Sequence, residues 1–194
     1  MSDDLAHTLA DDLEAGFPDL VRAFQDRLYG FALRLLHSPP DAEESVQDAF
    51  VRAYRALERY PAEQRRTLRL RPWLYRITLN VVRNRVRRPA LPSVGLDGPL
   101  GDGLAASPAE RPERLAEDAE RRARVARAIA DLPERYAAAV VLRHVQGLGY
   151  AEAASILDQP VGTTKSDVHR GLRLLREALE RDSLPESEGD YVYA

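Results

Sequence analysis

The sequence predicts an all-α protein of two small helical domains joined by a flexible linker. On both sides of residues 89–112, apolar residues recur at the i, i+3, i+4, i+7 spacing of an amphipathic helix, and no convincing strand pattern appears. Residues 89–112 hold five prolines and four glycines without any period, which is typical of a flexible linker. A length of 194 residues suits two small domains.

The N-terminal domain is expected at residues 17–88, after an acidic extension at 1–16. Apolar periodicity, interrupted by prolines, predicts its three helices at about 17–37, 41–60 and 71–88. The third has a proline in its first turn and an inward stripe of Leu74, Ile77 and Val81.

The C-terminal domain is expected at residues 113–180, followed by a polar tail at 181–194. The same apolar spacing predicts helices at about 112–132, 133–146, 150–157 and 161–180. Gly147 ends the second of these helices.

Composition excludes several kinds of chemistry. The sequence has no cysteine, so disulfides, thiol redox chemistry and cysteine-ligated zinc are excluded. The four histidines are scattered without a metal-ligand spacing, and we expect no metal and no cofactor. Residues 1–16 lack the apolar core of a signal peptide, and no apolar run approaches the roughly 20 residues that cross a bilayer. We therefore expect a soluble, cytoplasmic protein without membrane insertion.

The net charge of −3 hides a strong local bias. Residues 65–88 contain nine arginines and no acid, whereas residues 3–19 are rich in aspartate. This asymmetry predicts a dedicated surface that binds a polyanion. The alternative is an arginine-rich face that only meets solvent.

A helix-turn-helix is predicted in the C-terminal domain. A short helix at 150–157, the turn Asp158-Gln159-Pro160 and a longer helix from Val161 give the arrangement that inserts a second helix into a DNA major groove. The first turns of the longer helix offer outward side chains that can reach phosphates and base edges: Thr163, Lys165, Ser166, His169 and Arg170. An ordinary helical hairpin with a polar face is the alternative.

The third helix of the N-terminal domain is a second candidate surface for nucleic acid. Its face opposite the apolar stripe carries Arg76, Asn80, Arg83, Asn84 and Arg87. Guanidinium groups suit phosphates, and asparagine amides suit base edges. Two aromatics near this face, Tyr60 and Trp73, could stack on an unpaired base, although Trp73 could equally be a core residue.

An acidic stripe on the second helix has a different use. Asp41, Glu44 and Asp48 lie at i, i+3, i+7, with Gln47 beside them. Carboxylates repel DNA, so these side chains either meet solvent or contact a basic protein surface.

Five segments, taken together and in order, resemble the extracytoplasmic-function group of the sigma-70 family of RNA polymerase sigma factors. They are Phe31-Ala-Leu-Arg-Leu-Leu36, Asp41-Ala-Glu-Glu-Ser-Val-Gln-Asp-Ala-Phe50, Arg71-Pro-Trp-Leu-Tyr-Arg-Ile77, Leu132-Pro-Glu-Arg135 and Pro160-Val-Gly-Thr-Thr-Lys-Ser166. The resemblance covers about residues 17–176, in both domains and the linker between them.

The resemblance implies a transcription initiation factor, not an enzyme, whose partners are core RNA polymerase (β′ clamp helices and β flap), promoter DNA and an anti-sigma factor. The acidic stripe matches the segment that binds the β′ clamp helices. The third helix matches the segment that melts and reads the −10 element: Asn80 and Asn84 match positions that contact non-template bases, and Tyr60 matches an aromatic beside the flipped base. The C-terminal domain resembles the reader of the −35 element, and Arg143 joins the predicted outward residues there.

The chain departs from the family pattern at several positions. Asp167 stands where arginine is usual, which puts a phosphate contact in doubt. Thr164 and Gly171 replace a usual valine and alanine, and are expected to loosen the packing of the recognition helix. The loop at 61–70 is longer and richer in arginine than is common.

Three other functions account for less of the sequence. A conventional helix-turn-helix regulator that binds an operator without polymerase explains the C-terminal domain but leaves the third helix and the acidic stripe unused. An enzyme would need a nucleophile-base pair, a metal spacing or a phosphate loop, and none is found. An adaptor with two helical domains would explain the fold without any use of DNA.

Overall fold

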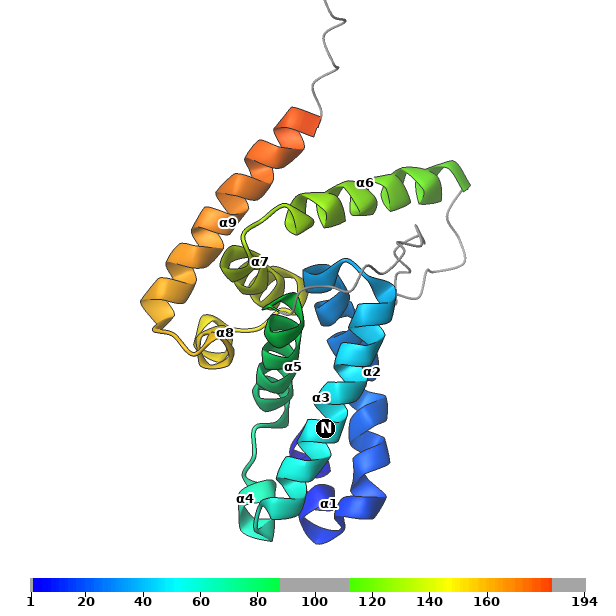
Figure 1. The fold of residues 1–194 in the computed structure, drawn as a ribbon, viewed down its shortest axis with the longest axis vertical. Helices are drawn as coiled ribbons and strands as arrows, with labels where there is room; N and C mark the ends of the chain where they lie inside the picture. Colours follow the sequence, from blue (N-terminus) through cyan, green and yellow to red (C-terminus); the bar gives the residue numbers. More distant parts are fainter. Residues whose placement is uncertain (1, 88–111, 183–194) are drawn as a thin grey trace, which may run out of the picture.

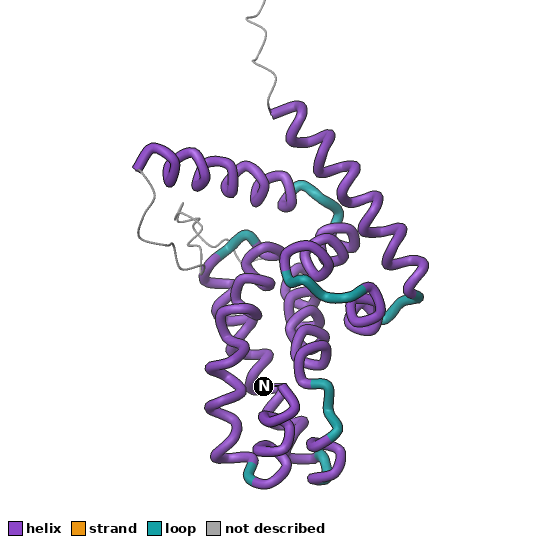
Figure 2. The backbone as a smooth tube through the Cα atoms, turned by 180° about the vertical axis from the view of Figure 1, so that it is seen from behind, coloured by secondary structure: helices purple, strands orange, loops and turns teal. Residues whose placement is uncertain are grey.

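The computed structural model describes residues 2–87 and 112–182. These residues form helices and connecting turns with no strand among them, as the fold class predicted (Figure 2). The helices are arranged in two groups, α1–α5 and α6–α9, with α5 of the first group beside α7 and α8 of the second (Figure 1). The predicted linker before Pro112 and the predicted tail after Asp182 lie outside the described residues.

The N-terminal domain has five helices. They are α1 (Ser2–Asp11), α2 (Leu13–Leu36), α3 (Pro39–Arg59), α4 (Ala62–Arg66) and α5 (Leu70–Arg87). The three long helices, α2, α3 and α5, agree with the three predicted helices to within a few residues. Asp12 begins α2 by accepting a hydrogen bond from the Ala15 amide at 3.0 Å, and Ser38 caps α3 ahead of its two N-terminal prolines.

Two short helices were not predicted. Residues 1–16 were expected as an extension and 61–70 as a loop, yet they contain α1 and α4, which pack against each other. The Arg65 guanidinium donates to the Leu9 carbonyl at 2.8 Å, and Arg66 pairs with Asp11 at 2.9 Å. Two arginines of the loop therefore hold the N-terminal helix.

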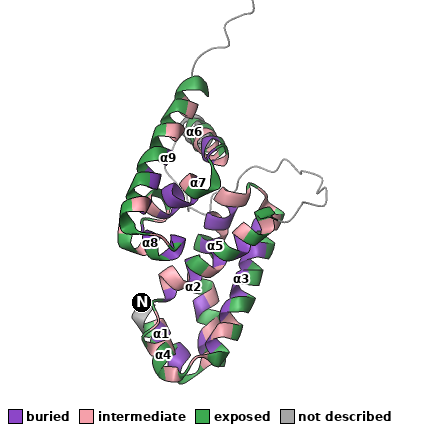
Figure 3. Cartoon of the chain, turned by 60° about the vertical axis from the view of Figure 1, so that its left-hand side comes forward, coloured by how far each residue is buried: buried purple, intermediate pink, exposed green. Residues whose placement is uncertain are grey.

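The core of the N-terminal domain lies between α2, α3 and α5. Phe31 of α2 is fully buried and meets the ring of Tyr75 edge-on, with centroids 5.2 Å apart. On α5, the predicted Leu74 and Val81 are buried, but so are Tyr75, Leu79 and Val82. A single apolar stripe underestimates this surface because α5 lies between α8 on one side and α2 and α3 on the other (Figure 3).

The C-terminal domain consists of α6 (Pro112–Ala130), α7 (Glu134–Val140), a π-helical turn η1 (Val141–Val145), α8 (Tyr150–Leu157) and α9 (Val161–Asp182). The predicted helix 133–146 therefore corresponds to α7 followed directly by the π-helical turn η1. Gly147 follows with a φ of 65°, a conformation that glycine adopts without a steric penalty. The two helices and the turn of the helix-turn-helix agree with the prediction. Among the described residues, no helix is long and apolar enough to cross a membrane.

Candidate nucleic-acid interface

The outward face of α5 carries the polar residues that the sequence predicted. Arg76, Asn80, Asn84 and Arg87 are exposed, and Arg83 is partly buried. They follow one side of a helix whose other sides are fixed by the core, so the backbone holds them in a row. The exposed amides of Asn80 and Asn84 lie one turn apart.

Three arginines seven residues apart contact the C-terminal domain through ion pairs. We call Arg69, Arg76 and Arg83 the arginine row. Arg69 immediately precedes α5, and Arg76 and Arg83, seven residues apart, lie on the same side of that helix. Their acceptors come from α7, from α8 and from the residue that ends α8. The pairs are Arg69 with Glu152 at 3.2 Å, Arg76 with Asp158 at 2.7 Å and Arg83 with Glu134 at 3.0 Å.

Gln146 adds a less exposed contact between the domains. The Tyr75 hydroxyl donates to Gln146 Oε1 at 2.5 Å, and Arg71 donates to the Gln146 carbonyl. Burial raises the pKa of the Tyr75 hydroxyl, so it keeps the proton that it donates. The arginine row and Gln146 therefore hold the C-terminal domain in contact with α5.

Tyr60 and Trp73 lie together at the start of α5. Their ring centroids are 6.2 Å apart with the planes tilted by 51°. Both side chains are partly buried and pack against the core. The structure thus joins the two aromatics that the sequence singled out, and each keeps some exposed surface.

Arg85 organises half of the acidic stripe. Its two terminal nitrogens pair with Asp41 at 2.6 Å and Glu44 at 2.7 Å. A hydrogen bond from Ser38 and the pairing with Arg85 lower the pKa of Asp41. Asp48 is exposed further along α3, and Gln47 donates to Glu43 at 3.4 Å. The four predicted residues therefore share one side of α3, but two of them are already paired with an arginine.

The helix-turn-helix has the predicted geometry. Asp158 ends α8 with a φ of 56°, and α9 begins three residues later. Lys165, Ser166, His169 and Arg170 are exposed on α9. Thr163 and Arg143 are partly buried. The structure thus presents a row of polar and cationic groups on the outer side of the helix.

The ring of Tyr150 lies close to two cations of this surface. The guanidinium carbon of Arg143 lies 5.0 Å from the centroid of the Tyr150 ring, and Lys165 Nζ lies 5.7 Å from it. Both distances are within the range of a cation–π interaction. The sequence did not identify Tyr150 as a residue of this surface. Its two cationic partners, Arg143 and Lys165, lie in other elements, and no local pattern indicates such contacts.

The inner side of α9 is more tightly packed than predicted. Thr164 and Asp167 are 0% and 1% exposed, and Gly171 is also buried. A Cβ added at Gly171 would lie 2.6 Å from Cγ2 of Val140, a separation that real Cβ atoms essentially never show. The expectation of looser packing is wrong, because the missing side chain lets α9 approach α7.

The arginines of residues 65–88 do not form one surface, contrary to the prediction of a single polyanion-binding face. Arg65 and Arg66 point to α1, Arg85 points to α3, and the arginine row points to the C-terminal domain. Arg88 lies outside the described residues. Neighbouring positions on a helix differ in direction by about 100°, so a run of like residues is divided among the elements around it.

Comparison with known proteins identifies the family. Residues 20–90 match Sigma-70 region 2, and residues 122–175 match Sigma-70, region 4. The ECF RNA polymerase sigma-E factor of Escherichia coli (strain K12) is 34% identical over 180 residues, which cover 89% of this chain and 88% of that protein. The chain belongs to the extracytoplasmic-function (ECF) sigma factors of the sigma-70 family.

Another sequence relative and a solved structure are also sigma factors. The ECF RNA polymerase sigma factor SigE of Mycolicibacterium smegmatis (strain ATCC 700084 / mc(2)155) is 35% identical over 173 residues, although the chain spans only 62% of that protein's length. The sigma factor RpoE, solved in complex with the anti-sigma factor NepR from Bartonella quintana, has the same fold, with a TM-score of 0.60 and 22% identity. That match covers 88% of this chain and 98% of the solved chain.

Each predicted surface of the sigma factor falls within a matched region. The region 2 match contains the acidic stripe, the arginine row and the outward face of α5, and the region 4 match contains α7, α8 and α9 as far as residue 175. α1 lies outside both matches. Among the described residues there is no group of three or more histidine, aspartate or glutamate side chains that could hold a metal ion.

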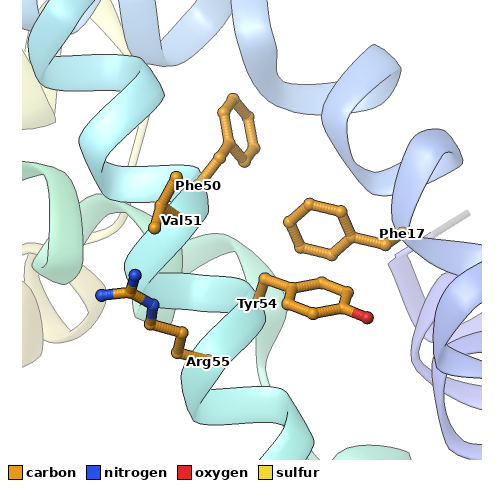
Figure 4. A pocket seen from close by; sticks show the side chains of 5 residues that line it. All are labelled: Phe17, Phe50, Val51, Tyr54 and Arg55. Carbon is orange, nitrogen blue, oxygen red and sulfur yellow. The ribbon is translucent and has the colours of Figure 1, made fainter.

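An aromatic cavity of about 250 Å³ lies between α2 and α3. One of its lining residues, Val51, is one helical turn beyond Asp48 of the acidic stripe. Figure 4 shows Phe17 of α2 facing Phe50 and Tyr54 of α3. Val51 and Arg55, also on α3, complete the lining of the cavity. The Phe17 and Tyr54 rings meet edge-on, with centroids 4.9 Å apart. The five lining residues include no acid and no histidine.

Proposed function

We propose that this sigma factor binds core RNA polymerase and directs transcription initiation by reading duplex DNA at the −35 element and a melted strand at the −10 element. One observation carries the proposal. Two separate helix faces, one in each domain, present outward side chains suited to DNA, while a third face presents carboxylates. A conventional operator-binding regulator would need only one of the three faces.

The −35 element is assigned to α9. A helix that follows a short helix and a tight turn enters the major groove with its N-terminal part. Lys165 and Arg170 there can reach phosphates or guanine, and Ser166 and His169 can reach base edges. Arg143 adds a cation at the edge of the same surface.

The −10 element is assigned to α5. The amides of Asn80 and Asn84 can both donate to and accept from an unpaired base. The Tyr60–Trp73 pair offers aromatic surface on which a flipped base can stack. Since a flipped base finds partners only on the protein, its capture favours the opened strand.

Core polymerase is assigned to the acidic stripe of Asp41, Glu44, Gln47 and Asp48. The stripe lies on α3, in the N-terminal domain, and two of its carboxylates pair with Arg85 of α5. A basic surface of a protein partner would complement it.

Promoter binding requires the two domains to separate. The guanidinium groups of the arginine row cannot pair with promoter phosphates while Glu134, Glu152 and Asp158 occupy them. The 24 residues from 89 to 112 can span at most about 80 Å when fully extended, which is enough to place the domains on different promoter elements.

We also assign control to an anti-sigma factor. The support is the fold shared with RpoE, which was solved with the anti-sigma factor NepR. A sigma factor of this kind breaks no covalent bond itself. Because RNA polymerase and the chromosome of a bacterium are in the cytoplasm, the protein would act there.

Run-off transcription tests the proposed function. Purified protein is added to core polymerase on a library of promoter fragments, and the start sites are sequenced. We expect transcripts that depend on the protein and share two sequence elements at fixed separation. Tight, sequence-specific binding by the protein alone, together with no transcript in the presence of polymerase, would instead establish an operator-binding regulator.

A further inference from the structure

The inner face of the recognition helix α9 carries three buried residues. Thr164, Asp167 and Gly171 lie at i, i+3 and i+7, so they share the side of α9 that faces α7 and the turn. All three are buried, whereas the residues on the outer side of the same turns are exposed. We call these three residues the α9 seat.

Gly171 fixes how closely the two helices approach. A Cβ at this position would lie 2.6 Å from Val140 Cγ2 and 3.3 Å from both the Cβ and the carbonyl oxygen of Tyr136. Two of these atoms belong to the rigid part of α7, so alanine could be accepted only if the helices moved apart. The separation of α9 from α7 therefore depends on the absence of this side chain.

Asp167 fixes the rotation of the helix. Its Oδ1 accepts from Arg135 of α7 at 2.5 Å, and its Oδ2 accepts from Gln159 of the turn at 3.1 Å. The Gln159 amide also donates to Thr164 Oγ1 at 3.1 Å, and the Thr164 hydroxyl donates to the Pro160 carbonyl at 3.2 Å. A buried carboxylate is costly to leave unpaired, so α9 can turn only by breaking contacts with two other elements.

The seat is directly linked to the outer surface. Ser166 and Asp167 are consecutive residues, and Arg170 precedes Gly171. Because α9 is one continuous helix from Val161 to Asp182, a shift of a few tenths of an ångström at the seat would also displace the outward side chains. Hydrogen bonds to base edges work only over donor–acceptor distances of about 2.7–3.2 Å, so they respond to such a shift.

We propose that Thr164, Asp167 and Gly171 are positioning residues that set the base preference of the sigma factor at the −35 element. This inference rests on the proposed function, in which α9 reads that element. The seat itself touches no DNA. It acts by holding Lys165, Ser166, His169 and Arg170 at one depth and one rotation relative to α7.

The main test uses the full chain with core polymerase on two promoter libraries, one randomised at the −35 element and one at the −10 element. We expect Gly171→Ala to change the ranking of −35 sequences and to leave the −10 ranking unchanged. Adding Val140→Ala removes the shortest of the three contacts and should shift the −35 ranking back toward the original, while the two contacts with Tyr136 remain. Gly162→Ala, whose Cβ would meet open space, serves as a thermal-stability control for the effect of replacing glycine by alanine in α9.

A second variant keeps the test decisive if Gly171→Ala folds poorly. Arg135 has 55% of its side chain exposed, so Arg135→Gln removes the pair with Asp167 without creating a cavity. We expect it also to change the −35 ranking. Loss of a mere phosphate contact would instead lower transcription from all −35 sequences alike.

The outcomes separate the inference from the proposed function. If the wild-type chain shows no dependence on the −35 sequence, the assignment of α9 to that element fails. If the wild-type chain does depend on it, but Gly171→Ala and Arg135→Gln keep the wild-type ranking, the α9 seat is only structural and the inference is overturned, whatever their overall yields.

Discussion

Asn80 and Asn84 are uncharged residues on a helix face whose neighbours Arg76, Arg83 and Arg87 are cations. An amide adds little attraction for phosphate, but it can donate to and accept from the same base edge. The contribution of these two residues is therefore expected in the choice of base, while the arginines supply the attraction to the DNA backbone.

Replacing Asn80 by alanine should reduce transcription and relax the preference at the −10 element only. A good base contact contributes about 1–3 kcal/mol of discrimination. Replacing Arg170 by alanine should weaken −35 recognition and leave the −10 preference unchanged. Run-off transcription on promoters varied at one element at a time measures both effects. The assignment of α5 is wrong if Asn80→Ala alters the −35 preference or has no effect at either element.

Tyr150 supports a different prediction, since its ring contacts both Arg143 and Lys165. Tyr150→Leu should weaken binding of the holoenzyme to −35 DNA by a few fold, because an exposed cation–π contact is worth about 0.5–1 kcal/mol. Tyr150→Phe keeps the ring and should bind like the wild type. Competition binding with a short −35 duplex measures the change. Equal loss in both variants would show that the hydroxyl, and not the ring face, matters.

At the scale of the helix, the acidic stripe on α3 has two unequal halves. Asp41 and Glu44 are held by Arg85, whereas Asp48 is exposed one turn further along. Holding two carboxylates in place reduces the conformational entropy lost when a partner binds them. A substitution at Asp48 therefore leaves the ion pairs between α3 and Arg85 of α5 in place.

Asp48→Lys should prevent binding to core polymerase and leave the helical circular dichroism spectrum unchanged. Glu44→Lys should have the same effect on binding but should also lower the melting temperature, because it breaks the pair with Arg85. Asp26→Lys, at an exposed acid on α2, makes the same charge change elsewhere and should leave binding intact. Holoenzyme formation by Asp48→Lys at the wild-type level would mean that the stripe only meets solvent.

At the scale of the whole molecule, the contact between the domains is suited to being reversed. Ion pairs between exposed side chains contribute about 0–1 kcal/mol each and weaken as salt is added. Arg76 and Asp158 form such a pair, whereas Glu152 and Arg83 are partly buried. Together with the contacts of Gln146 these pairs can close the chain, yet a polyanion or a large protein surface can compete for the same groups.

A charge exchange tests this contact directly. The sequence has no cysteine, so cysteines introduced at Glu58 and Glu180 can carry a fluorescent donor and acceptor. Energy transfer should fall in Arg76→Glu, because the new carboxylate would face that of Asp158, and should recover when Asp158→Arg is added. Raising the salt concentration should lower energy transfer in the chain with native charges. Identical transfer in all of these samples would mean that the arginine row does not hold the domains together.

Local signals in the sequence predicted much of this molecule, and contacts between distant residues explain the rest. The helix-turn-helix was predictable because its periodicity, its turn residues and Pro160 lie within one short stretch. α1 was missed because its few apolar residues, Ala6 and Leu9 among them, lie in an acidic segment. The partners of the arginine row lie 51 to 83 residues further along the chain, and no local pattern indicates such pairs.

Lys165 is the only lysine of the chain, and the structure leaves it exposed over the ring of Tyr150. Amine-reactive acylating reagents therefore have a single side-chain target, on the face proposed to meet the −35 element. The extent of acylation, measured by mass spectrometry on the peptide that contains residue 165, would report occupancy of that face without any mutation. Protection by −35 DNA in the holoenzyme, compared with the unprotected free chain, would turn a feature of composition into a footprinting probe for the recognition helix.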